Sequence, residues 1–202
     1  MSAARETILQ AIAKGRGVAK PVPDYILPSW PGETGAHFIT KAKASIAAVH
    51  EIVSPEDAPE TILSILIADG LTSRLHLPAA SPLNALPWHR APGLTLLPEP
   101  PDGNDSAFSM ADYGIAETGT LVFFSGPRSA SSWHFRPGCE FVLLSRNAIL
   151  PRVEDIIALI APWKSMPATL NLVTGPSRTA DIEQTIELGA HGPRALHILI
   201  AG

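Results

Sequence analysis

Apolar residues recur with the period of an α-helix in two stretches of the first third of the chain, and start and stop signals mark a third stretch. In the first of them, Ile8, Leu9 and Ile12 form one stripe. A serine–proline cap opens the third stretch, and a glycine closes it. The pattern therefore predicts helices over 1–15, 38–52 and 54–69.

Further along the chain, the apolar runs become short and continuous, which is typical of buried strands. Strands are predicted over 75–77, 94–97, 121–124, 140–145, 170–174 and 195–200, and helices over 153–160 and 179–188. Strands that alternate with helices indicate an α/β fold around a mostly parallel sheet.

A segment rich in proline and glycine follows the first predicted helix. It divides the chain into an N-terminal helix with its connector, 1–36, and one globular domain, 37–202. The length of 202 residues and the hydrophobic content of 46% suit a single domain with a sizeable core.

Composition excludes several classes of function. The formal net charge of -4 does not attract nucleic acid or an anionic membrane as a whole. No run approaches the ~20 apolar residues of a membrane span, so we expect a cytoplasmic protein. The one cysteine, Cys139, rules out an internal disulfide and an iron–sulfur cluster held by this chain alone. We interpret Cys139 as a small, partly buried residue.

The segment 173–181 places a glycine turn between a predicted strand and a predicted helix. Ligands bind at such junctions in open α/β sheets, and a helix N-terminus attracts anions. The guanidinium of Arg178 could form two hydrogen bonds to a carboxylate or phosphate. Ser177 and Thr179 could cap the predicted helix. A capped turn with Arg178 on the surface explains the segment equally well. The Gly-Lys-Ser/Thr ending of a Walker loop is absent.

A second glycine–arginine cluster, 189–194, precedes the final predicted strand. If that strand is parallel to its neighbour, this cluster lies at the opposite sheet edge from Arg178; if antiparallel, the two share an edge. His191 could be a general base or could cap the preceding helix, and capping is favoured.

Glu117 lies among small residues just before a buried strand, where a carboxylate is costly unless it is paired. It could be a catalytic base or nucleophile, or it could bridge to an arginine such as Arg178. The structural interpretation is slightly favoured. Asp112 suits a cap or turn.

The polar loop 125–134 contains serines and His134, but no Gly-x-Ser-x-Gly elbow occurs, so acyl transfer is disfavoured. The remaining histidines lack metal-ligand spacing. His197, inside an apolar strand, is predicted to be a core residue with satisfied hydrogen bonds.

Three segments together resemble the lactate utilization protein C family (LutC/YkgG), which is built on the LUD domain. They are 111–121, 175–183 and 189–194. The resemblance implies a fold like NagB, RpiA and the CoA transferases, with helices on both faces of the sheet. It also implies a role in oxidising L-lactate to pyruvate with two iron–sulfur partner proteins, which hold the clusters that this chain cannot.

The matching positions are carried over as candidate site residues. Glu117 is the catalytic candidate, and the candidate ligands of a small carboxylate or phosphate are Thr118, Gly119, Thr120, Gly175, Ser177, Arg178, Thr179, His191 and Arg194. No metal site is expected. One departure from the family is the segment 133–141, where many relatives have a proline-rich run and a strand with an internal histidine.

Two other functions stay open. The chain lacks a side chain suited to hydride chemistry, which favours a non-catalytic assembly or metabolite-sensing subunit. Fold analogy alone allows an enzyme that acts by itself on a phosphosugar or CoA thioester.

Overall fold

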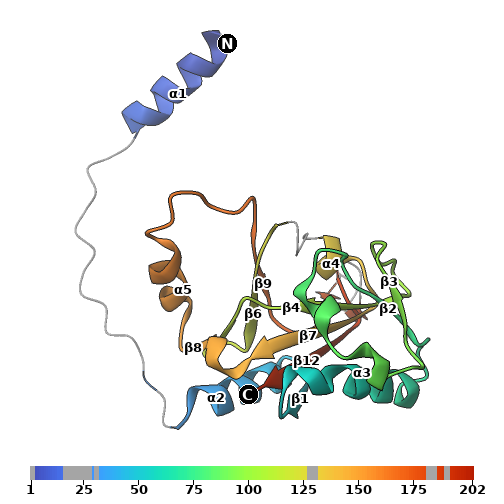
Figure 1. Ribbon diagram of the computed structural model, residues 1–202. Coiled ribbons are helices and arrows are strands. Elements are labelled where there is room, and N and C mark those ends of the chain that lie inside the picture. The colour runs from blue at the N-terminus through green and yellow to red at the C-terminus, as the bar shows by residue number, and fades with distance from the viewer. Residues whose placement is uncertain (1–2, 16–28, 30–31, 127–131, 181–185, 189–191) are drawn as a thin grey trace. The chain divides into compact units, whose positions relative to one another are not determined.

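The computed structural model describes residues 3–15, 29, 32–126, 132–180, 186–188 and 192–202 (Figure 1). The chain divides into two compact units, Met1–Pro31 and Gly32–Gly202. The first unit contains helix α1 (Ala3–Gly15), as the apolar stripe predicts, and none of the helix residues is buried. No helix in the described ranges has the length and apolar character that crossing a membrane requires.

The second unit is built on a six-stranded sheet in which every neighbouring pair is parallel. The strands are β1 (Ala48–Ile52), β2 (Arg74–His76), β3 (Thr95–Leu97), β4 (Ser106–Met110), β7 (Cys139–Ser145) and β12 (Ala195–Ala201). Their order is β1-β12-β7-β4-β2-β3. The α/β architecture predicted from the sequence is confirmed.

A second, smaller sheet arises within the crossovers that join β4 to β7 and β7 to β12. It has the order β8-β5-β6-β9 and consists of β5 (Tyr113–Ile115), β6 (Thr120–Phe124), β8 (Ile149–Leu150) and β9 (Leu170–Val173). Because β5 follows β4 after two residues and β8 follows β7 after three, the two sheets join at the carboxyl ends of these parallel strands.

Helices cover both faces of the large sheet. On one face, α3 (Ala58–Ala68) packs Ile62 and Leu66 into a core with Phe108 and Phe141. The chain also contains four 3₁₀ turns. One directly precedes α3 (Pro55–Asp57), two lie between β2 and β3 (Pro82–Ala85 and Trp88–Arg90), and one follows β7 (Arg146–Ala148). The other face carries α2 (Thr34–Ala44) and α4 (Ser132–Phe135), while α5 (Val153–Ile160) packs Ile156 onto the small sheet. The predicted helix over 153–160 is confirmed.

The predicted helix over 38–52 is wrong in its second half. The helix ends at Ala44, and the chain then enters β1. Ile46 adopts the left-handed conformation, with φ of 66°, and the amides of Ile46 and Ala47 bond to the carbonyls of Lys43 and Ala42. This is a Schellman ending, in which glycine usually occupies the left-handed position. With isoleucine there instead, the sequence carries no stop signal.

The predicted helix over 179–188 is also wrong. In its place β10 (Arg178–Ala180) pairs antiparallel with β11 (Ile186–Leu188). Residues 181–185 lie outside the described ranges. Thr179 and Ile186 are β-branched and fit a strand well, and the serine and threonine that resemble helix caps suit a turn equally. Within the described residues, therefore, no helix begins beside Arg178.

The sequence pattern misses β4, β5 and β8. In β4, serine and alanine alternate with larger residues, yet Ser106, Ala107, Phe108 and Ser109 are all buried. Small polar residues on a doubly covered strand give neither a continuous apolar run nor a polar face, so no periodic signal results.

Candidate functional site

The segment that contains Glu117 forms the turn of the β5–β6 hairpin. The Glu117 amide donates to the Pro151 carbonyl at 3.0 Å, and the Gly119 amide donates to the Ile115 carbonyl at 2.9 Å. Gly119 has φ of +69°, and a Cβ added there would lie 2.3 Å from the Ala42 amide nitrogen. Gly119 thus allows the hairpin to lie directly against the last turn of α2.

Gly175, in the segment 173–181, likewise allows two stretches of backbone to lie in direct contact. Its φ is +72°, and an added Cβ would lie 2.1 Å from the carbonyl oxygen of Ser45, in the turn that ends α2. Both predicted glycines are therefore required by contact between backbones of this chain. This structural role explains their presence without a ligand.

Threonine hydroxyls join the first two segments. Thr120 Oγ1 lies 2.6 Å from Thr118 Oγ1 and 2.6 Å from Thr174 Oγ1, so three hydroxyls form a hydrogen-bonded row. Thr120 is buried, whereas Thr118 and Thr174 are exposed. The structure thus brings a polar row from the interior to the surface between β6 and the end of β9.

Pro193, in the cluster 189–194, lies next to Ser177, in the segment 173–181, near the amino end of β12. The Ser177 amide donates to the Pro193 carbonyl at 2.8 Å. The last strand is parallel to both of its neighbours, and the sequence argument places the two clusters at opposite edges in that case. The two clusters nevertheless meet, because β9 belongs to the small sheet and not to the sheet that contains β12. His191 lies outside the described residues.

Arg194 ties the amino ends of three parallel strands together. Its guanidinium Nη2 donates to the Gly103 carbonyl at 3.0 Å and to Asn104 Oδ1 at 3.2 Å, just before β4. Its amide donates to the Gly138 carbonyl, just before β7. These bonds give Arg194 a structural role.

Glu117 and Arg178 form no ion pair with each other in the described part of the chain. Glu117 is half-buried and Arg178 is exposed, so the structural bridge favoured for Glu117 is not found. Thr179 lies in β10 beside Arg178. Lys41, which the sequence analysis does not select, is exposed on α2 with its backbone against Gly119. Thr118, Thr174, Lys41, Arg178 and Glu117 lie on or next to the two turns that contact the end of α2, and we call these five residues the motif surface.

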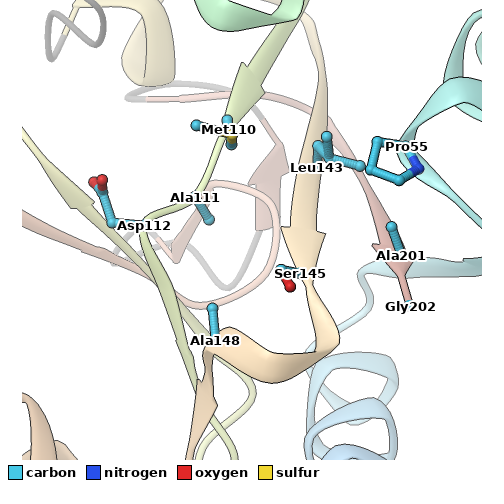
Figure 2. Close-up of a pocket in the computed structure, with 9 residues that line it drawn as sticks. All are labelled: Pro55, Met110, Ala111, Asp112, Leu143, Ser145, Ala148, Ala201 and Gly202. Carbon is cyan, nitrogen blue, oxygen red and sulfur yellow. The ribbon is translucent and has the colours of Figure 1, made fainter.

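A cavity of about 400 Å³ lies at the opposite, carboxyl edge of the large sheet (Figure 2). Its lining comes from the ends of β4, β7 and β12, the turns after β4 and β7, and the turn after β1, and comprises Pro55, Met110, Ala111, Asp112, Leu143, Ser145, Ala148, Ala201 and Gly202. Sequence reasoning selects Asp112 only as a cap or turn residue. The signal that could reveal this cavity is the rule that α/β ligand sites lie beyond the carboxyl ends of strands.

A buried polar network connects α4 to β4 and β7. Glu140 Oε1 accepts from Ser109 Oγ at 2.7 Å and lies 2.7 Å from His134 Nδ1. The side chains of Glu140 and His134 have no exposed surface, and the His134 ring stacks on Phe123 with ring centroids 3.9 Å apart. His134 thus pairs with a carboxylate in the core, so the serine–histidine dyad is not needed to explain it.

Two histidines on β1 and β12 form a chain with an aspartate. His50 Nε2 lies 3.2 Å from His197 Nδ1, and His197 Nε2 lies 3.6 Å from Asp69 Oδ2. Burial lowers the pKa of His50 below its ordinary value, and burial followed by the neighbouring His50 lowers the pKa of His197. His197 is therefore a buried, hydrogen-bonded residue, as predicted. Across the described ranges, no group of three or more potential ligands could hold a metal ion.

Cys139 is buried at the start of β7, and burial raises the pKa of its thiol to about 12. A thiol with such a pKa is protonated at neutral pH and is a poor nucleophile. The interpretation of Cys139 as a small buried residue is confirmed.

The parallel sheet, the helices on both faces and the inserted small sheet define an α/β protein. Comparison with known proteins then gives its family. The model described as LUD domain matches residues 102–201. The uncharacterized protein YkgG of Escherichia coli is 30% identical over 174 residues, which cover 83% of this chain and 73% of YkgG. The chain belongs to the LUD-domain family.

Other relatives agree with this assignment. Lactate utilization protein C of Halalkalibacterium halodurans is 30% identical over 118 residues, which span 56% of this chain and about half, 51%, of that protein. The crystal structure of a DUF162 family protein from Deinococcus radiodurans superposes with a TM-score of 0.59 at 24% identity, covering 85% of this chain and 100% of that one. That structure supports the α/β fold, while the likeness to NagB, RpiA and the CoA transferases stays a prediction.

Proposed function

We propose that this chain is a lactate utilization protein C-like subunit that takes part in oxidising L-lactate to pyruvate in the cytoplasm. The observation that supports this most directly is its similarity, at 30–33% identity, to proteins named lactate utilization protein C. The single buried cysteine agrees with a division of labour in which partner proteins hold the iron–sulfur clusters.

We propose further that the motif surface binds the small anion. The hydroxyls of Thr118 and Thr174 are joined through Thr120, and the exposed residues Arg178, four positions after Thr174, and Lys41, whose backbone lies against Gly119, supply the cations of the proposed site. An arginine recognises a carboxylate with two parallel hydrogen bonds, and hydroxyls can donate to the same group. Glu117, half-buried in the adjoining turn, is the carboxylate available as a base.

The test is lactate oxidation by the chain reconstituted with its two proposed iron–sulfur partners. Arg178→Ala is expected to lower kcat/KM for lactate by about tenfold or more, mainly through KM, because one charged hydrogen-bond pair contributes about 1.5–3 kcal/mol. Arg74→Ala, which removes an exposed arginine at the start of β2, is the matched control. Unchanged kinetics in folded Arg178→Ala would remove Arg178 from the site.

One observation favours the assembly alternative. Leu170 and Leu172 on β9 have 37% and 49% of their surface exposed. Trp163, which packs edge-on against Phe124, the cross-strand partner of Leu170, is 39% exposed. Exposed apolar side chains that lie together mark a contact surface for another protein. If the chain serves only for assembly, Leu172→Lys abolishes co-purification with the partners while Glu117→Gln and Arg178→Ala leave lactate oxidation intact.

A further inference from the structure

The carboxyl-edge cavity is separate from the motif surface. The motif segment 111–121 contributes Ala111 and Asp112 to the cavity lining, but none of the five motif-surface residues is among the lining residues given for the cavity. The cavity is lined by the last residues of β4, β7 and β12. Gly119 and Gly175, next to the motif surface, instead contact the end of α2, which precedes the amino end of β1.

The cavity has an apolar wall. Figure 2 shows Pro55, Leu143 and Ala201 on one side, with Met110 above them. The residues opposite include Ala111 and Ala148, whose short side chains leave the space open. A wall of this kind favours the apolar body of a ligand through the hydrophobic effect.

The charges at the cavity oppose an anion. Among the lining residues that belong to the described ranges there is no lysine, arginine or histidine, whereas Asp112 is one of them. The Asp112 carboxylate, which accepts from the Phe124 amide at 2.7 Å, is directed away from the apolar wall but brings its negative charge to the rim (Figure 2). The Arg146 guanidinium, next in the chain to the lining residue Ser145, donates to the Gly202 carbonyl and forms an ion pair with Glu51.

The volume of the cavity and the hydroxyl in its lining further restrict the class of ligand that fits. A volume of about 400 Å³ equals that of about thirteen water molecules, at ~30 Å³ each, which is much more than a lactate-sized acid fills. The exposed Ser145 hydroxyl does not cap the turn that follows it, and it forms no hydrogen bond within the described part of the chain. It can donate to or accept from a ligand.

We propose that the carboxyl-edge cavity is a second binding site, for an uncharged or cationic molecule with an apolar body of bicyclic-ring size and one polar group that reaches Ser145. Anions are excluded by Asp112 and by the lack of a cation among the described lining residues. The site does not depend on lactate or on the proposed partners.

Three probes that share one ring test the proposal: indole (neutral), tryptamine (cationic) and indoleacetate (anionic), each titrated calorimetrically into the full chain. Indole and tryptamine are expected to bind, and indoleacetate at least tenfold more weakly. Asp112→Asn keeps an oxygen for the Phe124 amide but removes the negative charge. It is expected to reduce the difference in binding affinity between tryptamine and indoleacetate.

Ser145→Phe, at an exposed position, is expected to fill the cavity and abolish binding, whereas Ala80→Phe, at an exposed position outside the lining, is the control. The proposal is overturned if indole fails to bind at millimolar concentration, if indoleacetate binds as tightly as indole, or if Ser145→Phe binds like the wild type. Should Ser145→Phe unfold, the Asp112→Asn comparison decides alone: an unchanged preference among the probes rejects the site.

Discussion

Single residues in this chain have roles that depend on what lies within a few ångströms of them. Gly70, Gly119 and Gly175 all have positive φ, of +66°, +69° and +72°. A Cβ at Gly70 would meet nothing within 4 Å, whereas one at Gly119 or Gly175 would collide with the end of α2. The three glycines share a backbone conformation and differ only in packing.

This difference predicts how substitution affects stability. Gly70→Ala is expected to cost about 1–2 kcal/mol, the cost of the left-handed conformation for an L-residue. Gly119→Ala and Gly175→Ala are expected to cost about 3 kcal/mol or more, because the backbone of α2 must also shift. Urea unfolding measures the three free energies. Equal losses for all three would show that the α2 contacts add nothing.

At the scale of elements, one carboxylate connects two strands and a short helix. Glu140 on β7 binds Ser109 on β4 and His134 on α4 through the same oxygen, Oε1. Within the described ranges Oε2 has no hydrogen-bond partner. A four-residue helix has little stability of its own, so the position of α4 depends on this network and on the stacking of His134 on Phe123.

Glu140→Ala is therefore expected to destabilise the protein by about 3–5 kcal/mol, because it leaves buried polar partners without an acceptor. Glu140→Gln keeps an oxygen in place and is expected to cost about half as much or less. Chemical denaturation compares the two with Glu154→Ala, a substitution at an exposed glutamate of α5 that should change stability by less than about 0.5 kcal/mol. Similar losses for Ala and Gln would contradict the assignment of the network to Oε1.

At the scale of the whole molecule, the second unit holds two regions of different chemistry. The motif surface offers hydroxyls and cations, and the carboxyl edge of the large sheet holds an apolar cavity with a carboxylate at its rim. The sheet also joins elements from the two ends of the unit, since β1 pairs with β12 and places His50 against His197.

The paired histidines make global stability depend on pH. Both pKa values are lower in the folded chain than the ordinary 6.5, so the unfolded chain binds more protons as the pH falls below that value. Stability is therefore unaffected by these groups above about pH 6.5 and is lost progressively below it. Asp69 opposes the shift of both pKa values, and Lys43 adds to that of His50.

We expect His197→Asn to flatten the dependence of unfolding free energy on pH between about 6.5 and 5, as measured by urea titrations at a series of pH values. His89→Asn, at an exposed histidine, serves as the control and should leave the slope as it is in the wild type. A wild-type slope in His197→Asn would mean that acid sensitivity arises elsewhere.

The sequence by itself determined the parts of this protein that depend on local patterns. Continuous apolar runs gave β7 and β12, a serine–proline cap with a closing glycine gave α3, and the three motif segments gave the family. These signals are local because burial on both faces, helical periodicity and motif identity can each be recognised within about a dozen residues.

Tertiary structure alone decided the rest. The end of α2 depends on an isoleucine in a conformation that glycine normally supplies, and the strand β10 replaces a helix because it gains a partner in β11. Pairing with β6 places β9 in the small sheet, and the two glycine–arginine clusters lie together as a result. The carboxyl-edge cavity is built from residues that are up to 147 positions apart, Pro55 and Gly202, which no local pattern relates. Contacts between distant segments decide these features, and their energies are not encoded in any single window of the chain.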